Sequence, residues 1–266
     1  MIVPEESLSE RPGIAQYFGR LAKTYGEGAY YGKRRAAVIA TLREEIQGAP
    51  RVLDLGCGNG ANLFELRDAI RCELIVGADL SRHMLAEADR RQRAGIARVP
   101  LLCADAMALP FRTDAWDVIF CSHVLQMVPD VASCVRGIGM SLKPGGLLVV
   151  AGGGGRMGGQ MFANLTDEQR AILGAGRRGG RARETVRDLE LIQDTCKAEG
   201  FAVERKRLPL TVTGAELAEW YRIRWIPVLD DSMRAAVEQV LEQVMAERGA
   251  EQFESAETLL FARKRG

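Results

Sequence analysis

The run RVLDLGCGNG at residues 51–60 constrains the fold of this chain more than any other feature. A short apolar stretch with the bulk of a buried strand contains Asp54, and glycines then come at every second position. Glycine permits a sharp turn and lets a ligand approach the backbone with no Cβ in the way. Residues 59–69 are helix-like, so such a ligand would meet the N-terminus of a helix. A single glycine-rich loop is a weak signal, and its meaning depends on the other motifs of the chain.

Composition favours a cytoplasmic enzyme. The 266 residues are 47% apolar, enough for one large core, and the formal net charge of +1 gives no footprint for nucleic acid or an anionic membrane surface. No apolar run is long enough to span a bilayer, and the N-terminus lacks a signal-peptide pattern. The six cysteines form no CxxC pair, which is typical of thiols in a reducing compartment.

Strand and helix patterns alternate along most of the chain. The expected strands are residues 51–55, 73–79, 98–103, 116–121, 147–151, 201–208 and 257–263. The expected helices are residues 13–24, 33–47, 59–70, 82–94, 131–142, 184–199, 214–225 and 231–247. Nearly continuous apolar strands separated by helices are typical of a parallel sheet covered on both faces. The Gly/Arg-rich stretches 152–160 and 174–183 are expected to be flexible.

Polar residues lie at the carboxyl ends of the first four strands, where open α/β sheets bind ligands. Asp54 and the glycine loop belong to the first strand and its end. Asp79, a carboxylate suited to accept both hydroxyls of a ribose, ends the second. Asp105 and Ala106 come after the third, placing a side-chain acceptor beside a backbone donor as an adenine edge requires. Cys121, Ser122 and His123 close the fourth, where a reacting group would lie.

This ordered set resembles the class I S-adenosylmethionine-dependent methyltransferases, and looks most like the small-molecule branch with the ubiquinone/menaquinone-type enzymes. The matching segments are VLDLGCGNG (52–60), GADLSRHML (77–85), CADAMALPF (103–111), WDVIFCSHVLQMVPD (116–130) and LKPGGLLVV (142–150). The resemblance implies an α/β fold: a Rossmann-like, doubly wound, seven-stranded sheet, mostly parallel with an antiparallel last strand, plus a helical cap.

We find no internal repeat and no clear interdomain linker, so residues 1–266 are expected to form one methyltransferase domain. Its expected parts are N-terminal helices and cap (1–48), a cofactor-binding core (49–151), mobile cap or substrate segments (152–199 and 209–250) and final strands (200–208 and 257–264).

The resemblance also implies S-adenosylmethionine as cofactor. The glycines would pass beneath its methionine moiety, Asp79 would bind the ribose, and Asp105 with Ala106 the adenine. The full set of expected cofactor-binding residues is Asp54, Gly56, Gly58, Gly60, Asp79, Leu80, Asp105, Ala106, Cys121 and Tyr25.

The acceptor pocket is harder to read. Candidate substrate residues are Tyr17, Tyr30, Trp220, Tyr221 and Arg224, although aromatic residues at helical spacing equally fit a core. Further candidate walls lie in the loop after the fifth strand: Arg156, Met157, Met161 and Phe162. His123 is the candidate general base, with packing or a hydrogen bond to substrate as the alternative. Methyl transfer from a sulfonium mainly needs positioning and exclusion of water, and two histidines without metal-ligand spacing predict no metal site.

The sequence therefore predicts an enzyme that moves a methyl group to an O, N or C atom of a small molecule, either a secondary metabolite or quinone-like. The expected partner is that substrate, without nucleic acid or membrane, and a homodimer stays open.

Three alternatives remain. The same cofactor could serve aminocarboxypropyl transfer or its own cyclisation. Gly56, Gly58 and Ala61 fit the GxGxxA pattern of a nicotinamide-dependent oxidoreductase, but that leaves Asp105 unexplained. A nucleic-acid or protein methylase would place an Asn-Pro-Pro-Tyr-like tetrad where CSHV stands at 121–124.

Overall fold

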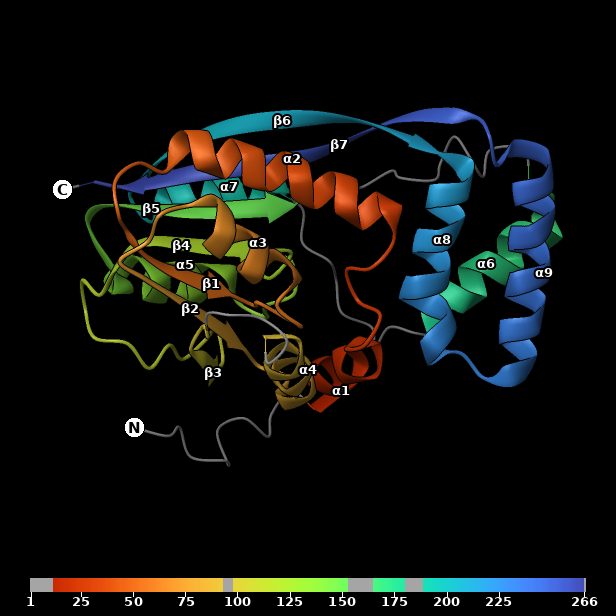
Figure 1. Cartoon of the computed structure of the whole chain (residues 1–266), viewed down its shortest axis with the longest axis horizontal. Coiled ribbons are helices and arrows are strands. Elements are labelled where there is room, and N and C mark those ends of the chain that lie inside the picture. The colour runs from red at the N-terminus through yellow and green to blue at the C-terminus, as the bar shows by residue number, and fades with distance from the viewer. Residues whose placement is uncertain (1–11, 93–97, 153–164, 180–188, 266) are drawn as a thin grey trace.

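The computed structural model describes residues 12–92, 98–152, 165–179 and 189–265 (Figure 1). The strands are β1 (Arg51–Leu55), β2 (Leu74–Asp79), β3 (Leu101–Cys103), β4 (Trp116–Ser122), β5 (Leu142–Gly152), β6 (Phe201–Thr213) and β7 (Gln252–Lys264). The helices are α1 (Pro12–Leu21), α2 (Ala29–Glu45), α3 (Ala61–Ala69), α4 (Arg82–Gln92), α5 (Val131–Ser141), α6 (Asp167–Gly179), α7 (Leu189–Ala198), α8 (Gly214–Trp225), the 3₁₀ turn η2 (Ile226–Val228) and α9 (Asp231–Arg248).

The seven strands form one sheet in the order β3-β2-β1-β4-β5-β7-β6. Strands β1 to β5 are parallel, whereas β7 runs antiparallel between β5 and β6. The predicted fold class is confirmed. The strand order reverses between β1 and β4, and the carboxyl ends of strands at such a switch point flank a ligand crevice.

The sheet is buried on both faces, as its apolar strands predict. Leu53 and Leu55 of β1 belong to one apolar cluster, which also contains residues of α5 and α7. Val52 points to the opposite cluster, which contains residues of α2 and α3. All three side chains are at most 1% exposed. This packing fixes the direction and register of β1, and with them the position of the glycine loop.

The β6–β7 pair is longer than predicted and runs past the sheet to a group of three helices, α6, α8 and α9 (Figure 1). Pairing continues through Pro209↔Ala256 to Thr213↔Gln252. Thr213 then begins α8 with a capping box, because its side chain accepts the Glu216 amide hydrogen bond and Glu216 accepts that of Thr213.

Helices α6, α8 and α9 share an apolar core of their own, and α6 includes a segment that was predicted to be flexible. Residues 174–179, expected to be flexible, are the last turns of α6. Leu173 in this helix is buried in the core, and the Tyr221 hydroxyl donates to its carbonyl oxygen at 2.5 Å. Residues 152–160, apart from Gly152, and 180–183 lie outside the described residues.

Two strand boundaries also differ from the prediction. Strand β3 begins at Leu101 rather than at residue 98, since Pro100 has no N–H to donate to β2. Strand β5 begins at Leu142 rather than at residue 147, because Leu142 pairs with Trp116 before an irregularity shifts the register. Within the described ranges, no helix combines the length and apolar composition needed to cross a bilayer.

Candidate active site

A cavity lies at the carboxyl ends of β1, β2 and β4, with α1, α2 and the segment between them contributing a further wall. It holds about 1240 Å³ of empty space, part of which is open to solvent. The residues predicted from sequence that line it are Tyr25, Gly56, Gly58, Asp79, Leu80, Asp105, Ala106 and His123. Asp54, Gly60 and Cys121 are not lining residues.

The three glycines of the loop have different reasons to be glycine. All have positive φ, at 77°, 55° and 84° for Gly56, Gly58 and Gly60. A Cβ on Gly56 would lie 2.1 Å from the Val124 side chain, and one on Gly60 would lie 2.4 Å from the ring of Phe64. A Cβ on Gly58 would meet only the Met84 sulfur, at 3.9 Å. Packing therefore explains two glycines, and Gly58 is the one that leaves room on the cavity side.

Asp79 holds the loop in place. One carboxylate oxygen accepts the Gly58 amide at 2.8 Å, and the other accepts the Ser81 amide at 2.8 Å. Burial raises the pKa of Asp79, and these two amides oppose the rise. The Ser81 hydroxyl accepts the Met84 amide at 3.4 Å, so Ser81 caps the N-terminus of α4 and Asp79 is not needed for that role. Asp105 similarly shapes its own turn, since its carboxylate accepts the Met107 amide at 2.9 Å.

Asp54 lies beneath this loop with 1% of its surface exposed. Neither carboxylate oxygen has a hydrogen-bond partner among the described residues. Burial, together with the charge of Asp79, raises the pKa of Asp54 to about 8. The side chain therefore favours a nearby cation, although it does not reach the cavity surface. Cys121 is fully buried in the apolar core, and burial raises the pKa of its thiol well above the usual value.

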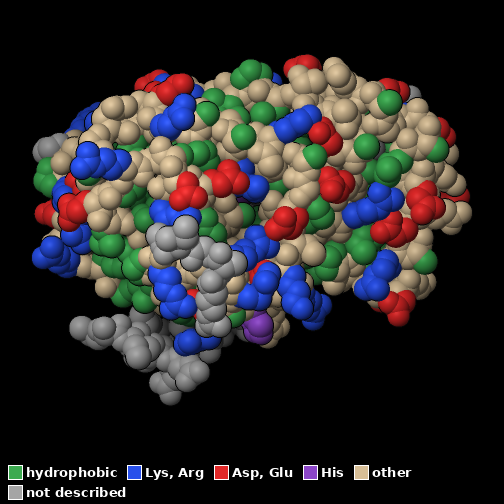
Figure 2. Space-filling view, in the orientation of Figure 1, with side chains coloured by type: hydrophobic (Ala, Val, Ile, Leu, Met, Phe, Trp, Pro, Cys, Tyr) green, Lys and Arg blue, Asp and Glu red, His purple; other side chains and the backbone are tan. Residues whose placement is uncertain are grey.

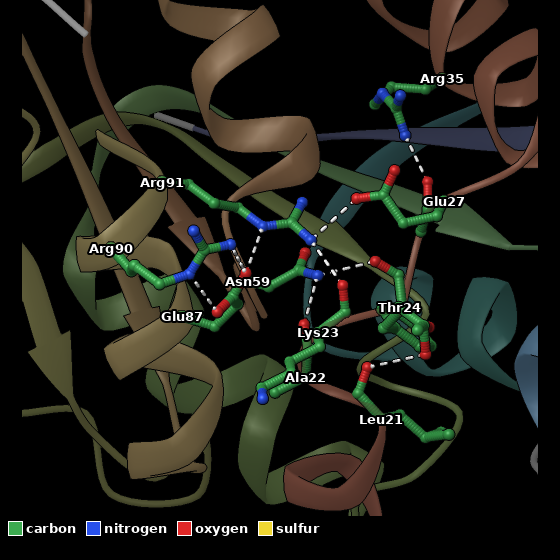
Figure 3. A network of polar contacts seen from close by, with 12 residues as sticks. Leu21, Ala22, Lys23, Thr24, Glu27, Arg35, Asn59, Glu87, Arg90 and Arg91 are labelled. Atoms are coloured by element: carbon green, nitrogen blue, oxygen red, sulfur yellow. Dashed lines mark hydrogen bonds and ion pairs between the residues drawn. The ribbon is translucent and has the colours of Figure 1, made fainter. Parts of the chain in front are cut away.

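Asn59 ties the segment between α1 and α2 to the loop. Its buried side-chain amide donates to the carbonyl oxygens of Ala22, at 2.8 Å, and Tyr25, at 2.7 Å. Figure 3 shows arginines that bind the same segment from two helices. Arg91 of α4 donates to the Lys23 carbonyl, and Arg35 of α2 donates to that of Gly26. These bonds place Tyr25 over the cavity. Sequence reasoning missed Asn59, although an amide within a glycine loop was an available signal.

His123 follows the last pairing of β4 in an unusual backbone conformation. Its φ of 58° is in the left-handed region, and its amide donates to the Ala151 carbonyl at 2.9 Å. Arg34 of α2 contacts His123 Nε2 through Nη2 and donates from Nε to Glu257 of β7 at 2.6 Å. Burial and the charge of Arg34 lower the pKa of His123.

Glu257 is fully buried behind His123 and Arg34. Burial alone would raise its pKa, but the charge of Arg34, with His123, holds it at about 2. Sequence reasoning missed Arg34 and Glu257. Neither belongs to a motif, and they are separated from each other by 223 positions.

The comparisons with known proteins agree with the observed fold. Residues 53–150 match the methyltransferase domain family. The family match and the observed fold support the resemblance of this chain to the class I S-adenosylmethionine-dependent methyltransferases.

Among curated relatives, the chain is 35% identical to a demethylmenaquinone methyltransferase of Thermus thermophilus, over 52% of this chain and 61% of that protein. It is 32% identical to a malonyl-[acyl-carrier protein] O-methyltransferase of Alcanivorax borkumensis, over 56% of this chain and 51% of that protein. The solved YcgJ protein of Bacillus subtilis superposes with a TM-score of 0.61 at 19% identity, covering 88% of this chain and 98% of that one. The match spans about half the length of the first curated relatives.

The predicted substrate residues are not among the residues that line the cavity. They are Tyr17, Tyr30, Trp220, Tyr221 and Arg224. The four aromatic residues belong to or pack against the core that α8 shares with α6 and α9, because their helical spacing turns them inward. Their role toward a substrate stays a prediction. Arg156, Met157, Met161 and Phe162 lie outside the described residues.

The residues at the cavity fit the family's cofactor. S-adenosylmethionine carries a ribose diol, an adenine and positive charge at its sulfonium. Asp79 and Asp105 line the cavity as acceptors, Asp54 lies beneath them as an unpaired acid, and Gly58 leaves its side of the loop open. In the part of the chain that the structure describes, no three His, Cys, Asp or Glu side chains are grouped as a metal site.

Proposed function

We propose that the chain transfers the methyl group of S-adenosylmethionine to an O, N or C atom of a small molecule. The observation that carries this proposal is the convergence of Gly58, Asp79 and Asp105, which belong to the ends of three different strands, on one cavity that His123 also lines. When bound, S-adenosylmethionine supplies an electrophilic methyl group, so the protein's part is to bind, orient and exclude water.

In this proposal the cofactor half of the cavity works by hydrogen bonding. Asp79 accepts from the ribose hydroxyls, while Asp105 and the Ala106 amide bind the adenine edge. Asp79 already holds the Gly58 amide, so the loop that carries Gly58 and the ribose site share one anchor. Asn59 holds the segment with Tyr25 over this half.

His123 has a narrower role than the predicted general base. Two groups contact His123 Nε2: the Arg34 guanidinium, which can only donate, and Glu257 Oε1 at 3.2 Å, which can only accept. We assign the proton to Nδ1, because the Arg34 contact is the closer of the two, so Nε2 accepts. A neutral imidazole in that state offers an N–H and has no free lone pair for the acceptor's proton. We assign His123 as a hydrogen-bond donor to the methyl acceptor.

The relatives' names support a small-molecule or carrier-bound acceptor, of the quinone or acyl type. Figure 2 shows basic and acidic side chains interspersed over one face of the molecule, which supports a substrate other than a polyanion. The proposal includes one domain, a cytoplasmic location and a homodimer as a potential assembly.

Calorimetry and mass spectrometry test the proposal together. We expect saturable binding of S-adenosylmethionine and of adenosylhomocysteine, and adenosylhomocysteine as the nucleoside product of turnover with an accepted substrate. Methylthioadenosine as the product would instead indicate aminocarboxypropyl transfer or cyclisation. Absence of binding by either nucleoside, with a folded protein, would refute the cofactor assignment.

A further inference from the structure

We propose that the methyl acceptor reacts as an anion, through an ionised oxygen such as a phenolate, enolate or carboxylate, and that Arg224 supplies the positive charge that selects it. This inference rests on the proposed methyl transfer. It concerns the end of the cavity formed by His123, Arg34 and the aromatic residues of α1 and α2.

Apart from Arg224, the charged side chains around His123 neutralise one another. Arg34 lines the cavity, and its Nε donates to Glu257 at 2.6 Å, so these two side chains form a neutral pair. With its proton assigned to Nδ1, His123 accepts from Arg34 through Nε2 and is neutral, in line with the lowering of its pKa by burial. Arg34, Glu257 and His123 together therefore contribute no net charge at this end of the cavity.

Arg224 adds a buried positive charge with no acidic partner. No carboxylate of the described residues lies within ion-pair distance of its guanidinium, and its Nη1 is buried without a hydrogen-bond partner there. The guanidinium instead packs over the rings of Phe18, at 5.1 Å, and Tyr25, at 5.3 Å. Both rings line the cavity, so Arg224 lies one side chain behind its wall.

Tyr17 and Tyr31, two of the neighbouring tyrosines, do not supply the missing anion. The hydroxyl of Tyr17 donates to the Arg224 carbonyl oxygen at 3.2 Å. Burial raises the pKa of Tyr31 above its usual value, despite the opposing charges of Arg224 and Arg34. Tyr17 and Tyr31 therefore remain neutral phenols, and the Tyr25 side chain is a hydrogen-bond partner of the Arg224 guanidinium. In this proposal an anionic ligand supplies the carboxylate-like counter-charge that Arg224 lacks among the described residues.

An anionic acceptor satisfies every group at this end of the cavity. Its charge would compensate Arg224, and the His123 Nδ1–H would donate to its oxygen. An acceptor that binds already ionised needs no general base, which agrees with the occupied Nε2 of His123. The reaction then balances simply: the oxygen (or conjugated carbon) of the anion forms a bond to the methyl carbon, the methyl–sulfur bond breaks, and its electron pair stays on sulfur.

The test compares anions with neutral isosteres in the presence of saturating adenosylhomocysteine. The probes are 4-nitrophenolate against 4-nitroanisole, and benzoate against benzamide, titrated into the full chain by calorimetry. We expect at least one anion to bind about tenfold or more tightly than its neutral match. Bound 4-nitrophenol should also ionise at a lower pH than in water, by about 1 unit for a tenfold preference, as read from the phenolate absorbance.

Three variants assign the effect. Arg224→Gln should abolish the preference for the anion, and Arg224→Lys should restore most of it. Arg222→Gln on the same helix, where Arg222 pairs with Glu238, should leave the preference unchanged. If Arg224→Gln does not fold, the wild-type preference and the lysine variant still decide the question.

Several results would overturn the inference. One is equal binding of anions and neutral matches, or no binding of any anion, by protein that binds adenosylhomocysteine. Another is a loss of adenosylhomocysteine affinity in Arg224→Gln with the anion preference intact, which would assign Arg224 to the nucleoside's own carboxylate. Failure of the wild-type protein to bind adenosylhomocysteine would instead refute the proposed function.

Discussion

Two buried carboxyl groups, one beneath the glycine loop and one behind His123, have pKa values that are shifted in opposite directions. Asp54, beneath the glycine loop, has a pKa raised to about 8, whereas the pKa of Glu257, behind His123, is lowered to about 2. Both are at most 1% exposed, so burial does not distinguish them. Glu257 lies against Arg34, whereas the charged group that acts on Asp54 among the described residues is another acid, Asp79. The glycine-loop side is acidic and suits a cationic cofactor, and the His123 side is basic and suits an anion.

The largest expected effect on cofactor binding is that of Gly58→Val, on the glycine-loop side. The side chain would project on the cavity side of the loop from a residue with φ of 55°, which a β-branched residue tolerates poorly. We expect adenosylhomocysteine binding to fall at least about 100-fold, roughly 2.7 kcal/mol, in a folded protein. Gly137→Ala, on α5 with open space around it, is the control for calorimetry. Wild-type affinity in Gly58→Val would mean that the cofactor lies elsewhere.

On the His123 side, Glu257→Gln tests the buried ion pair. Removing the carboxylate leaves the Arg34 guanidinium buried without its counter-charge, so we expect the free energy of unfolding to fall by about 3–5 kcal/mol. Urea denaturation near pH 7 measures this loss. Glu199→Gln, which removes an exposed pairing with Arg136, should cost less than about 1 kcal/mol. Equal losses in the two variants would show that the Glu257 pair is no stronger than a surface pair.

Asp79→Ala should weaken the cofactor site by a smaller amount than Gly58→Val. The substitution removes an acceptor for the ribose hydroxyls and the anchor of the Gly58 amide, together worth about 1–3 kcal/mol. The matched control is Asp68→Ala, an exposed carboxylate on α3. An unchanged dissociation constant for adenosylhomocysteine in Asp79→Ala would remove the ribose assignment.

Because the pKa values of Asp54 and Glu257 are shifted in opposite directions, the two groups predict opposite pH dependences of the free energy of unfolding. Asp54 holds a proton in the folded chain between about pH 4 and pH 8, where the unfolded chain has lost it, so stability falls as pH rises through this range. The slope reaches at most about 1.4 kcal/mol per pH unit for one proton. Glu257 contributes above pH 4.5, and its contribution is lost as pH falls toward 2. Urea unfolding of Asp54→Asn should lose the first slope, and identical slopes in variant and wild type would contradict the assignment.

The contrast between the two sides of the cavity also explains which site residues could be predicted from the sequence. Asp54, Gly58, Asp79 and Asp105 each lie at or just after the end of a strand, and strand order in a parallel sheet brings such residues together, so local pattern predicted them. The same patterns predicted the sheet and most helix boundaries.

The basic side depends on contacts that no local pattern encodes. Arg34, His123 and Glu257 come from α2, the end of β4 and β7, and they meet only because β7 inserts beside β5. The predicted β6 and β7 are too short for a similar reason. Their outer halves are stabilised by pairing with each other and by the apolar core of α6, α8 and α9. Helical spacing indicated Tyr221 as a residue of a core or a pocket but could not distinguish the two, and α2 begins at Ala29, so Tyr30 lies within a helix that was expected to begin at residue 33.

The central claim is that the cavity between the glycine loop and His123 holds the nucleoside of S-adenosylmethionine. A crystal structure of the chain with adenosylhomocysteine tests it most directly. We expect the ribose hydroxyls within hydrogen-bond distance of the Asp79 carboxylate, the adenine beside Asp105, and the sulfur on the side of the cavity that His123 lines. A nucleoside bound away from Gly58 and Asp79 would contradict the account.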